Sequence, residues 1–357
     1  MNMSAATHTG EIMSNDLGAV AAPSTGNAAT PDKPEKPATT HKVRQSTSIV
    51  ERYALVGLLV LAFAICALFL PEFRSTGIVS AMINSQAIIL LLALAATLAL
   101  RTGDFDLAIP GVMVTSACVV AVMSTNGYSP AVVILVALAV GVVVGLINAL
   151  LVVKIGVDSF ITTLGMFTAL SGIGYAITDS KIVTGVPDFY VELSRAKLMG
   201  LPMTTWYAWL FVAVLWFVYQ RTPVGRYMLF IGGNRDAALL AGISVARIRT
   251  ITYVVSGLVG AIIGIILVGN LGAIDPGIGN QYLLAPFAAT FLGATAITVG
   301  RFNPIGTMVA VYLLVVGITG LQLAGAASWV SPLFNGLALM IAVALAKLVG
   351  KRRGAAK

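Results

Sequence analysis

Charged residues are scarce in this sequence of 357 residues. Asp, Glu, Lys and Arg together make up only 10% of it, whereas 58% of the residues are hydrophobic. Soluble globular domains carry charges on about a quarter of their residues. The mean hydropathy is +0.94. This composition excludes an ordinary soluble domain and predicts a polytopic membrane protein.

Histidine and cysteine are nearly absent. His8 and His41 both precede the first apolar run, so the hydrophobic body has no histidine for a metal site or a general base. Cys66 and Cys118 each lie within an apolar run, which argues against a structural disulfide. The sequence also lacks a G-x-x-x-x-G-K-[ST] stretch, so this chain has no Walker A loop to bind ATP. We therefore expect no catalytic residue, no metal and no cofactor in this chain.

The first 50 residues differ from the rest. They are rich in Ala, Thr, Ser, Pro and Asn, as in "AAPSTGNAATPDKPEKPATT", and show no hydrophobic periodicity. Such segments cannot bury enough apolar surface to fold. The sequence therefore predicts a disordered cytoplasmic tail at 1–50, a transmembrane domain at 51–350 and a basic cytoplasmic C-terminus at 351–357. No cleaved signal peptide is expected, because the first apolar run starts only near Tyr53.

A helix needs roughly 20 apolar residues to cross the hydrocarbon core of a bilayer. Read at that length, the sequence predicts an all-α protein with about ten transmembrane helices. The predicted spans are 53–70, 83–100, 107–124, 130–152, 159–177, 204–220, 251–270, 284–300, 304–322 and 331–348. Only "RTGDFDL" separates the second from the third, so that pair is also compatible with a broken or re-entrant element.

Lysine and arginine are distributed unevenly between the connecting segments. With the N-terminus inside, the segments on that side hold 18 of the 22 Lys and Arg residues, and the opposite side holds 4. Cytoplasmic loops of membrane proteins carry such an excess. Both termini are therefore predicted to be cytoplasmic. The bias also accounts for the net charge of +8, so the expected partner is membrane lipid, with no role for nucleic acid.

Two kinds of residue stand out within or between the spans. Gly141 with Gly145 and Gly260 with Gly264 form GxxxG pairs, which let helix backbones approach closely, so we expect helix packing there. Polar groups in membrane helices face the bundle interior. A pathway or gate is predicted at Asn84, Gln86, Asp104, Asp106, Asn148, Thr162 and Thr163.

The role of these polar residues stays open at this point. The neutral ones suit a neutral, hydroxyl-rich solute better than an ion, although interhelical hydrogen bonds explain the same residues. For Asp104 and Asp106, three roles are open, namely a structural one, a part in gating and proton coupling. Asp106 is predicted to cap the next helix by accepting from a backbone N–H two or three residues on.

The stretch "FIGGNRDAALLAGISVARIRT" at 230–250 is the longest soluble-looking piece between two spans. Asn234 is a good N-cap, and Asp236 complements a helix N-terminus. Gly242 fits the position after a helix C-cap, with Ile243 as the accompanying hydrophobic contact. Ser244 is placed to cap a second helix, with Arg247 and Arg249 facing the cytoplasm. The sequence predicts a short surface helix, which either floats on lipid or docks a cytoplasmic partner.

Four segments, in order, resemble motifs of the permease subunits of bacterial ABC sugar importers, the ribose/xylose/autoinducer-2 permease family. "TGDFDLAIPGVMV" (102–114) is similar to T-G-G-x-D-L-S-V-G-S-V. "NALLVVKIGVDSFITTLGM" (148–166) resembles N-G-x-x-V followed by Pro-x-Phe-Ile-x-T-L-G. "GGNRDAALLAGISVARIR" (232–249) resembles G-x-N-x-x-A-A-x-x-x-G-I-x-V. "FLGATAITVGRFNPIGTMVAV" (291–311) resembles V-L-G-G-x-S-x-x-G-G-x-G.

The resemblance implies a permease in the bacterial inner membrane that works as a homodimer or heterodimer. An extracytoplasmic sugar-binding protein would deliver the solute, and a separate ATPase subunit would bind ATP and Mg. The resemblance implies that the chain is not itself an enzyme. It also implies a coupling helix that docks on the ATPase, formed by Asn234, Arg235, Asp236, Ala237, Ala238, Ala241, Gly242, Ile243, Val245 and Arg247.

The sequence departs from the family pattern at several positions. Asp104 stands where the family has Gly, Asp158 replaces a common Pro, Ala294 replaces a Gly, and "GRFNP" replaces a Gly-rich turn. These departures indicate a divergent subgroup. Two alternative functions stay open, namely an ion-coupled secondary transporter and an ABC permease for branched-chain amino acids.

Overall fold

The computed structural model describes the backbone of residues 49–354 and the side chains of residues 52–344. Almost all of the predicted tail at 1–50 therefore lies outside the described residues. Within them the fold is all-α apart from four two-residue strands, which confirms the predicted fold class. Among the described residues, six helical segments are long and apolar enough to cross a membrane, and two shorter apolar helices accompany them. The chain is a multi-pass membrane protein, while the number of ten spans stays a prediction.

The helices follow one another with short connections. The long ones are α1 (Ile49–Phe69), α3 (Ala87–Arg101), α4 (Ile109–Thr125), α5 (Pro130–Ala149), α6 (Ser159–Ile177), α8 (Met203–Arg221), α11 (Val245–Leu271), α13 (Pro304–Leu323) and α14 (Val330–Gly354). The shorter ones are η1 (Pro71–Arg74), α2 (Thr76–Ser85), η2 (Leu150–Ile155), α7 (Asp188–Arg195), α9 (Pro223–Gly233), α10 (Arg235–Leu240), η3 (Pro276–Tyr282) and α12 (Ala285–Gly293).

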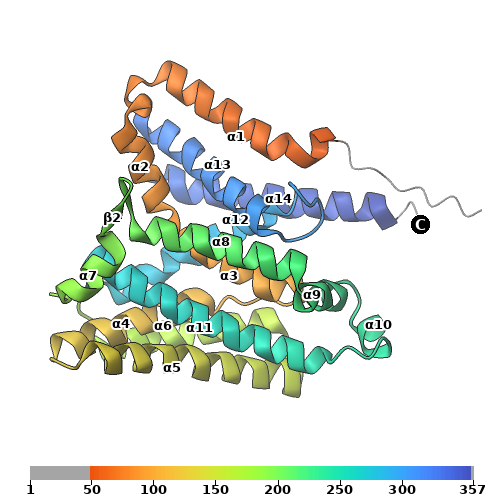
Figure 1. Ribbon diagram of the computed structural model, residues 1–357, viewed down its shortest axis with the longest axis horizontal. Helices are drawn as coiled ribbons and strands as arrows, with labels where there is room; N and C mark the ends of the chain where they lie inside the picture. The colour runs from red at the N-terminus through yellow and green to blue at the C-terminus, as the bar shows by residue number, and fades with distance from the viewer. Residues whose placement is uncertain (1–48, 355–357) are drawn as a thin grey trace, which may run out of the picture. The chain divides into compact units, whose positions relative to one another are not determined.

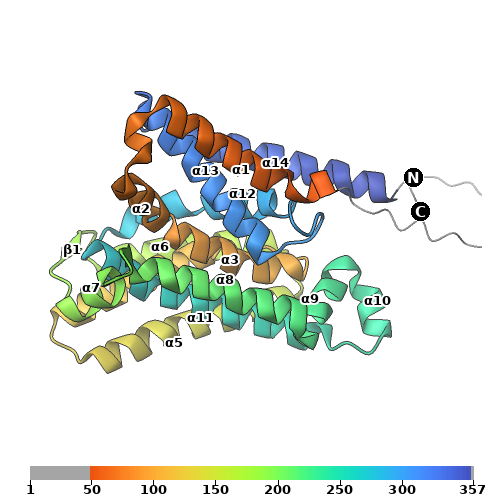
Figure 2. The same cartoon turned by 45° about the horizontal axis from the view of Figure 1, so that its top comes forward.

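Two groups of helices lie on either side of α3 and α8. Figures 1 and 2 show α1, α13 and α14 together on one side and α5 and α11 on the other. Helix α3 is buried along nearly its whole length, because α8, α11, α12 and α13 all contact it. Helices α9 and α10 lie at one end of the bundle and α7 at the opposite end (Figure 1). The count of Lys and Arg assigns the end with α9 and α10 to the cytoplasm.

Several predicted boundaries need correction. The span predicted at 284–300 is helical only to Gly293, because the Asn303 amide donates to the carbonyls of Gly293, Ala296 and Arg301 and so holds the following connection in a turn. The helix predicted at 130–152 is α-helical to Ala149 and continues as the π-helical η2. The span predicted at 83–100 is preceded by α2 and broken at Gln86.

The connection between α6 and α8 is folded onto the bundle. Strand β1 (Val183–Thr184) pairs with β4 (Ala273–Ile274), and β2 (Lys197–Leu198) pairs with β3 (Leu201–Pro202). In α7, the Ser194 hydroxyl donates to the Ile266 carbonyl over 3.0 Å, and Arg195 donates to the Asn270 carbonyl over 2.7 Å. The loop is therefore fixed to the outer end of α11.

Candidate functional site

Helix α10 has well-formed ends. Asn234 is its N-cap, and its side-chain oxygen accepts from the backbone N–H of Ala237 over 3.0 Å, as predicted. After the C-cap Ala241, Gly242 adopts a φ of +76°, its N–H donates to Leu239, and the N–H of Ile243 donates to Ala238. These two bonds form a Schellman motif. The short helix thus holds its shape through its own capping groups.

Removing the N-cap tests how much it contributes. Asn234→Ala is expected to weaken α10 by about 1 kcal/mol, because the N–H of Ala237 loses its acceptor. Hydrogen exchange at the amides of the first turn of α10 should speed up about fivefold. Asn234→Ser, which keeps a capping oxygen, should exchange at nearly the original rate. Equal exchange in the alanine variant would show that packing alone holds the helix.

Helix α9 was missed in the sequence. The hydroxyl of Thr222 accepts from the N–H of Gly225 over 3.5 Å, and Pro223 occupies the first helical position. Thr followed by Pro is a helix-start signal that could have predicted it. Its end packs backbone to backbone on the end of α3, since a Cβ on Gly232 would overlap the carbonyl oxygen of Arg101. The surface element therefore consists of two helices, α9 and α10.

These two helices expose large apolar side chains at the end assigned to the cytoplasm. Tyr227, Phe230, Leu239 and Leu240 are exposed, and Leu240 reaches 91% exposure. Ala238, by contrast, is fully buried and packs with Ile231 and Val245. Contiguous exposed apolar patches mark interaction sites. The outward surface of α9 and α10 is thus a candidate docking surface, anchored from behind by a small apolar cluster.

The α3–α4 connection is tied to this element by a buried carboxylate. Asp104 accepts from Arg235 of α10 over 2.6 Å and from Arg249 of α11 over 2.7 and 2.8 Å. The prediction that Arg249 faces the cytoplasm is wrong, because its side chain is only 11% exposed. Arg247 is exposed. The resulting three-residue group, Asp104 with Arg235 and Arg249, is called the ion-pair cluster below.

Arg101, one turn earlier, joins a different set of elements. Its guanidinium donates to the carbonyl of Gly225 in α9 over 3.3 Å and to the carbonyl of Phe302 over 2.9 Å. It also lies over the ring of Tyr219, 4.2 Å from the centroid. Carbonyl acceptors and a cation–π contact thus satisfy a largely buried cation. The cytoplasmic end of α3 therefore holds α8, α9 and the α12–α13 connection together.

Asp106 lies two residues beyond Asp104 and has separate partners. It accepts from the Ser256 hydroxyl of α11 over 2.6 Å and from the N–H of Ala108 over 3.1 Å. The predicted backbone bond is present, although the N-cap residue of α4 is Ala108. Burial raises the pKa of Asp106 to about 6, and the bonds from Ser256 and Ala108 oppose that rise. Asp106 thus pins the start of α4 to α11.

The residues predicted to line a pathway fall into separate places. Asp104, Asp106 and Thr163 meet at the α3–α4 connection, where the Thr163 hydroxyl accepts from the N–H of Leu107 over 3.0 Å. Asn148 and Thr162 are buried, each with a side-chain oxygen that has no partner within the described residues. Asn84 and Gln86 lie at the α2–α3 break. Gln86 lines a small cavity, of about 50 Å³, together with Ser331 and Asn335.

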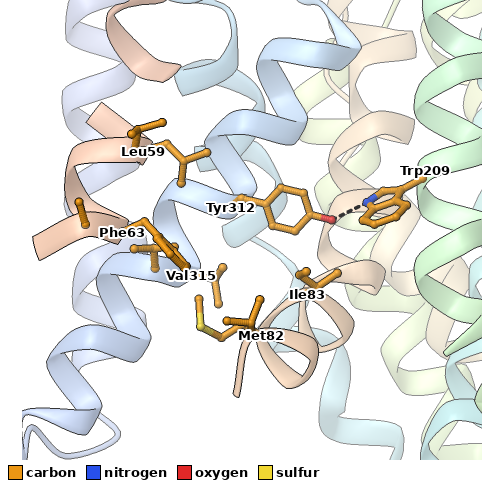
Figure 3. Close-up of a pocket in the computed structure, with 11 residues that line it drawn as sticks. Leu59, Phe63, Met82, Ile83, Trp209, Tyr312 and Val315 are labelled. Atoms are coloured by element: carbon orange, nitrogen blue, oxygen red, sulfur yellow. Dashed lines mark hydrogen bonds between the residues drawn. The ribbon is translucent and has the colours of Figure 1, made fainter. Parts of the chain in front are cut away.

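A larger cavity of about 430 Å³ lies between α1, α2, α8 and α13 (Figure 3). Its walls are apolar and include Leu59, Phe63, Met82 and Val315. The polar atoms at its edge bond to each other, since Trp209 Nε1 donates to the Tyr312 hydroxyl over 2.7 Å. A sugar needs hydrogen-bonding groups when it leaves water. This cavity therefore suits hydrocarbon and cannot serve as a sugar site.

The four glycines predicted to pack helices lie at helix contacts. A Cβ on Gly141 would overlap the carbonyl of Gly257, and one on Gly145 would overlap the carbonyl of Tyr253, both in α11. On the same helix, Gly260 and Gly264 approach the α4 backbone. Helix α11 therefore packs closely against both α4 and α5. No group of three metal-ligating side chains occurs among the residues whose side chains are described.

A model of the family described as branched-chain amino acid transport system / permease component matches residues 78–344. The ribose import permease protein of Bacillus subtilis is 31% identical over 292 residues, which cover 81% of this chain and 90% of that protein. The autoinducer 2 import system permease protein of Photorhabdus laumondii is 30% identical over 298 residues, covering 82% and 89%.

A third relative is similar over a shorter stretch. The galactofuranose transporter permease protein of Escherichia coli is 31% identical over 245 residues, which cover 68% of this chain and 72% of that protein. No solved structure matches this chain. The matched residues include the ion-pair cluster, α9 and α10, so the candidate site lies within the similar region.

Proposed function

Because the chain belongs to the family of permease components of branched-chain amino acid transport systems, we propose that it is the membrane-spanning subunit of an ATP-driven importer for a monosaccharide or related polyol. The observation that carries the proposal is the similarity to import permeases for ribose, autoinducer 2 and galactofuranose along most of the chain. ATP and Mg would be bound by a separate ATPase subunit.

The exposed surface of α9 and α10 supports a docking role for this element. In the proposed importer the ATPase subunit covers Phe230, Leu239 and Leu240, which are exposed in the single chain. ATP-driven closure of the ATPase would move α10, and α11 would carry the movement into the membrane. An extracytoplasmic sugar-binding protein would deliver the solute at the end where α7 lies. A second permease copy would complete the pathway.

The sugar class is favoured over the amino acid class by the character of the described polar groups. A zwitterionic amino acid calls for charged contacts, yet Gln86, Ser331 and Asn335 around the small cavity are neutral. Asp104 is already paired with two arginines. For ion coupling, Asp106 is the better candidate, because it is buried and its hydrogen-bond partners are the neutral Ser256 and Ala108.

Uptake in cells that lack their own sugar importers tests the proposal. Cells given this permease, its ATPase subunit and its sugar-binding protein should accumulate labelled sugar, and omitting the ATPase should abolish the accumulation. A protonophore at unchanged ATP should have no effect, because no ion gradient drives the proposed import. Uptake without the ATPase that collapses with the protonophore would replace the proposal with secondary transport. Labelled leucine uptake by the same set of proteins would favour the amino acid class.

A further inference from the structure

We propose that Asp104 and Arg249 are positioning residues that fix the first turns of α11 to the α3–α4 connection, so that movement of α10, which leads into α11 and is bonded to Asp104 through Arg235, reaches the spans. This inference rests on the proposed function, because it assigns the means by which the docking element acts. It concerns the ion-pair cluster alone and leaves the partner's identity to the experiment above.

The cluster brings together three elements that are far apart in the sequence. Asp104 follows the end of α3, Arg235 opens α10, and Arg249 lies in the second turn of α11. One carboxylate accepts three charge-assisted bonds of 2.6 to 2.8 Å, and Arg235 also donates to the carbonyl of Gly103 over 3.3 Å. Such bonds are shorter and stronger than neutral ones. Relative movement of any two of these elements must break at least one of them.

The bonds made by the two arginines differ in burial and geometry. Arg249 binds Asp104 in a bidentate manner, through Nε and one terminal nitrogen. The Arg249 side chain is 11% exposed and that of Asp104 is 2% exposed. Removing one partner of a buried pair leaves an uncompensated charge, which is strongly unfavourable. Arg235 binds the carboxylate through one nitrogen, and its side chain is 42% exposed. Water can replace that bond at little cost. The bond from Arg249 therefore holds α11 firmly to the α3–α4 connection, whereas the bond from Arg235 allows α10 to move away from Asp104 and return.

The cluster has no second carboxylate within the described residues to balance its two arginines. Without Asp104, Arg235 and Arg249 would repel each other, and α10 would move away from α11. The pairing with the two arginines accounts for how a carboxylate is accommodated at a buried position next to a membrane span.

The test measures coupling in the reconstituted importer, with permease, ATPase subunit and sugar-binding protein in proteoliposomes. The quantity is labelled sugar taken up per ATP hydrolysed. Asp104→Asn and Arg249→Gln are expected to lower this ratio at least tenfold, while the amount of ATPase that co-purifies stays within twofold. Arg235→Gln should lower it about twofold. The matched controls Asp158→Asn and Arg221→Gln remove the same charges from exposed positions at the same end and should leave the ratio unchanged.

Two outcomes overturn the inference. One is an unchanged ratio in Asp104→Asn. The other is an unchanged ratio in the double variant Asp104→Asn with Arg249→Gln, which leaves neither partner of the buried pair charged. This double variant is measured if Asp104→Asn alone does not insert into the membrane, because that variant leaves the charge of Arg249 uncompensated. Failure of the original complex to couple ATP hydrolysis to uptake would instead overturn the proposed function.

Discussion

Glutamate in place of Ala241 is expected to reduce sugar uptake to background in cells that contain normal amounts of the permease. Ala241 is exposed at the C-cap of α10 and directly follows Leu240, the most exposed side chain of the candidate docking surface. A larger, charged side chain there would hold the ATPase away and place an unpaired carboxylate in the contact. Because the position is exposed, the variant should still fold and insert. Ala237→Arg, on the same helix, should behave alike.

The measurement is uptake of labelled sugar, with the amount of permease in the membrane determined by immunoblot. Val157→Glu provides the control, since Val157 is exposed in the α5–α6 connection at the same end of the bundle and lies outside α9 and α10. It should transport normally. Normal uptake in Ala241→Glu at normal abundance would rule out a docking role for α10.

Alanine in place of Gly141 is expected to destabilise the helix bundle strongly. By helix propensity alone, a Gly→Ala change in a helix stabilises it by about 1 kcal/mol. At Gly141, however, the new Cβ would overlap the carbonyl of Gly257 and crowd Ala261, so α5 and α11 would have to move apart. Overpacking of this kind costs about 1–3 kcal/mol. The packing contact therefore reverses the sign that propensity predicts.

Gly172 is the matched control, because it also lies within a span, in α6, and has nothing within 4 Å of an added Cβ. Gly172→Ala should be neutral or slightly stabilising. The measurement is the temperature at which the detergent-solubilised protein loses its monodisperse peak in size-exclusion chromatography. Equal temperatures for the two alanine variants would show that α5 and α11 can separate without loss of stability.

Local signals in the sequence predicted the local structure well. Span 159–177 coincides with α6, and the caps of α10 lie at Asn234 and Gly242, because such ends are decided by side chains within a few residues. The missed helix α9 carried a local signal too, at Thr222 and Pro223. The predicted span at 284–300 was too long, because apolar composition does not reveal the turn that Asn303 holds.

Partners distant in the sequence could not be predicted. Asp104 is separated from Arg235 by 131 positions and from Arg249 by 145. Their meeting depends on how α3, α10 and α11 pack, which no spacing rule encodes. The same holds for Arg101, whose acceptors are backbone carbonyls that every residue possesses. Asp104, Arg235 and Arg249, which the sequence placed in a pathway or at the surface, therefore form one ion-pair cluster in the structure.

Helix α11 continues without a break from Val245, just after α10, to Leu271, beside α7. At 1.5 Å per residue, its 27 residues form a rod about 40 Å long. A tilt of about 5° at one end would displace the other by roughly 3.5 Å for a rod of that length. Since α7 is bonded to the far end of this rod through Ser194 and Arg195, such a tilt would displace α7 together with that end. If binding at α7 outside changes the affinity of α10 for a partner inside, thermodynamic reciprocity requires that binding at α10 change the affinity at α7 by the same factor.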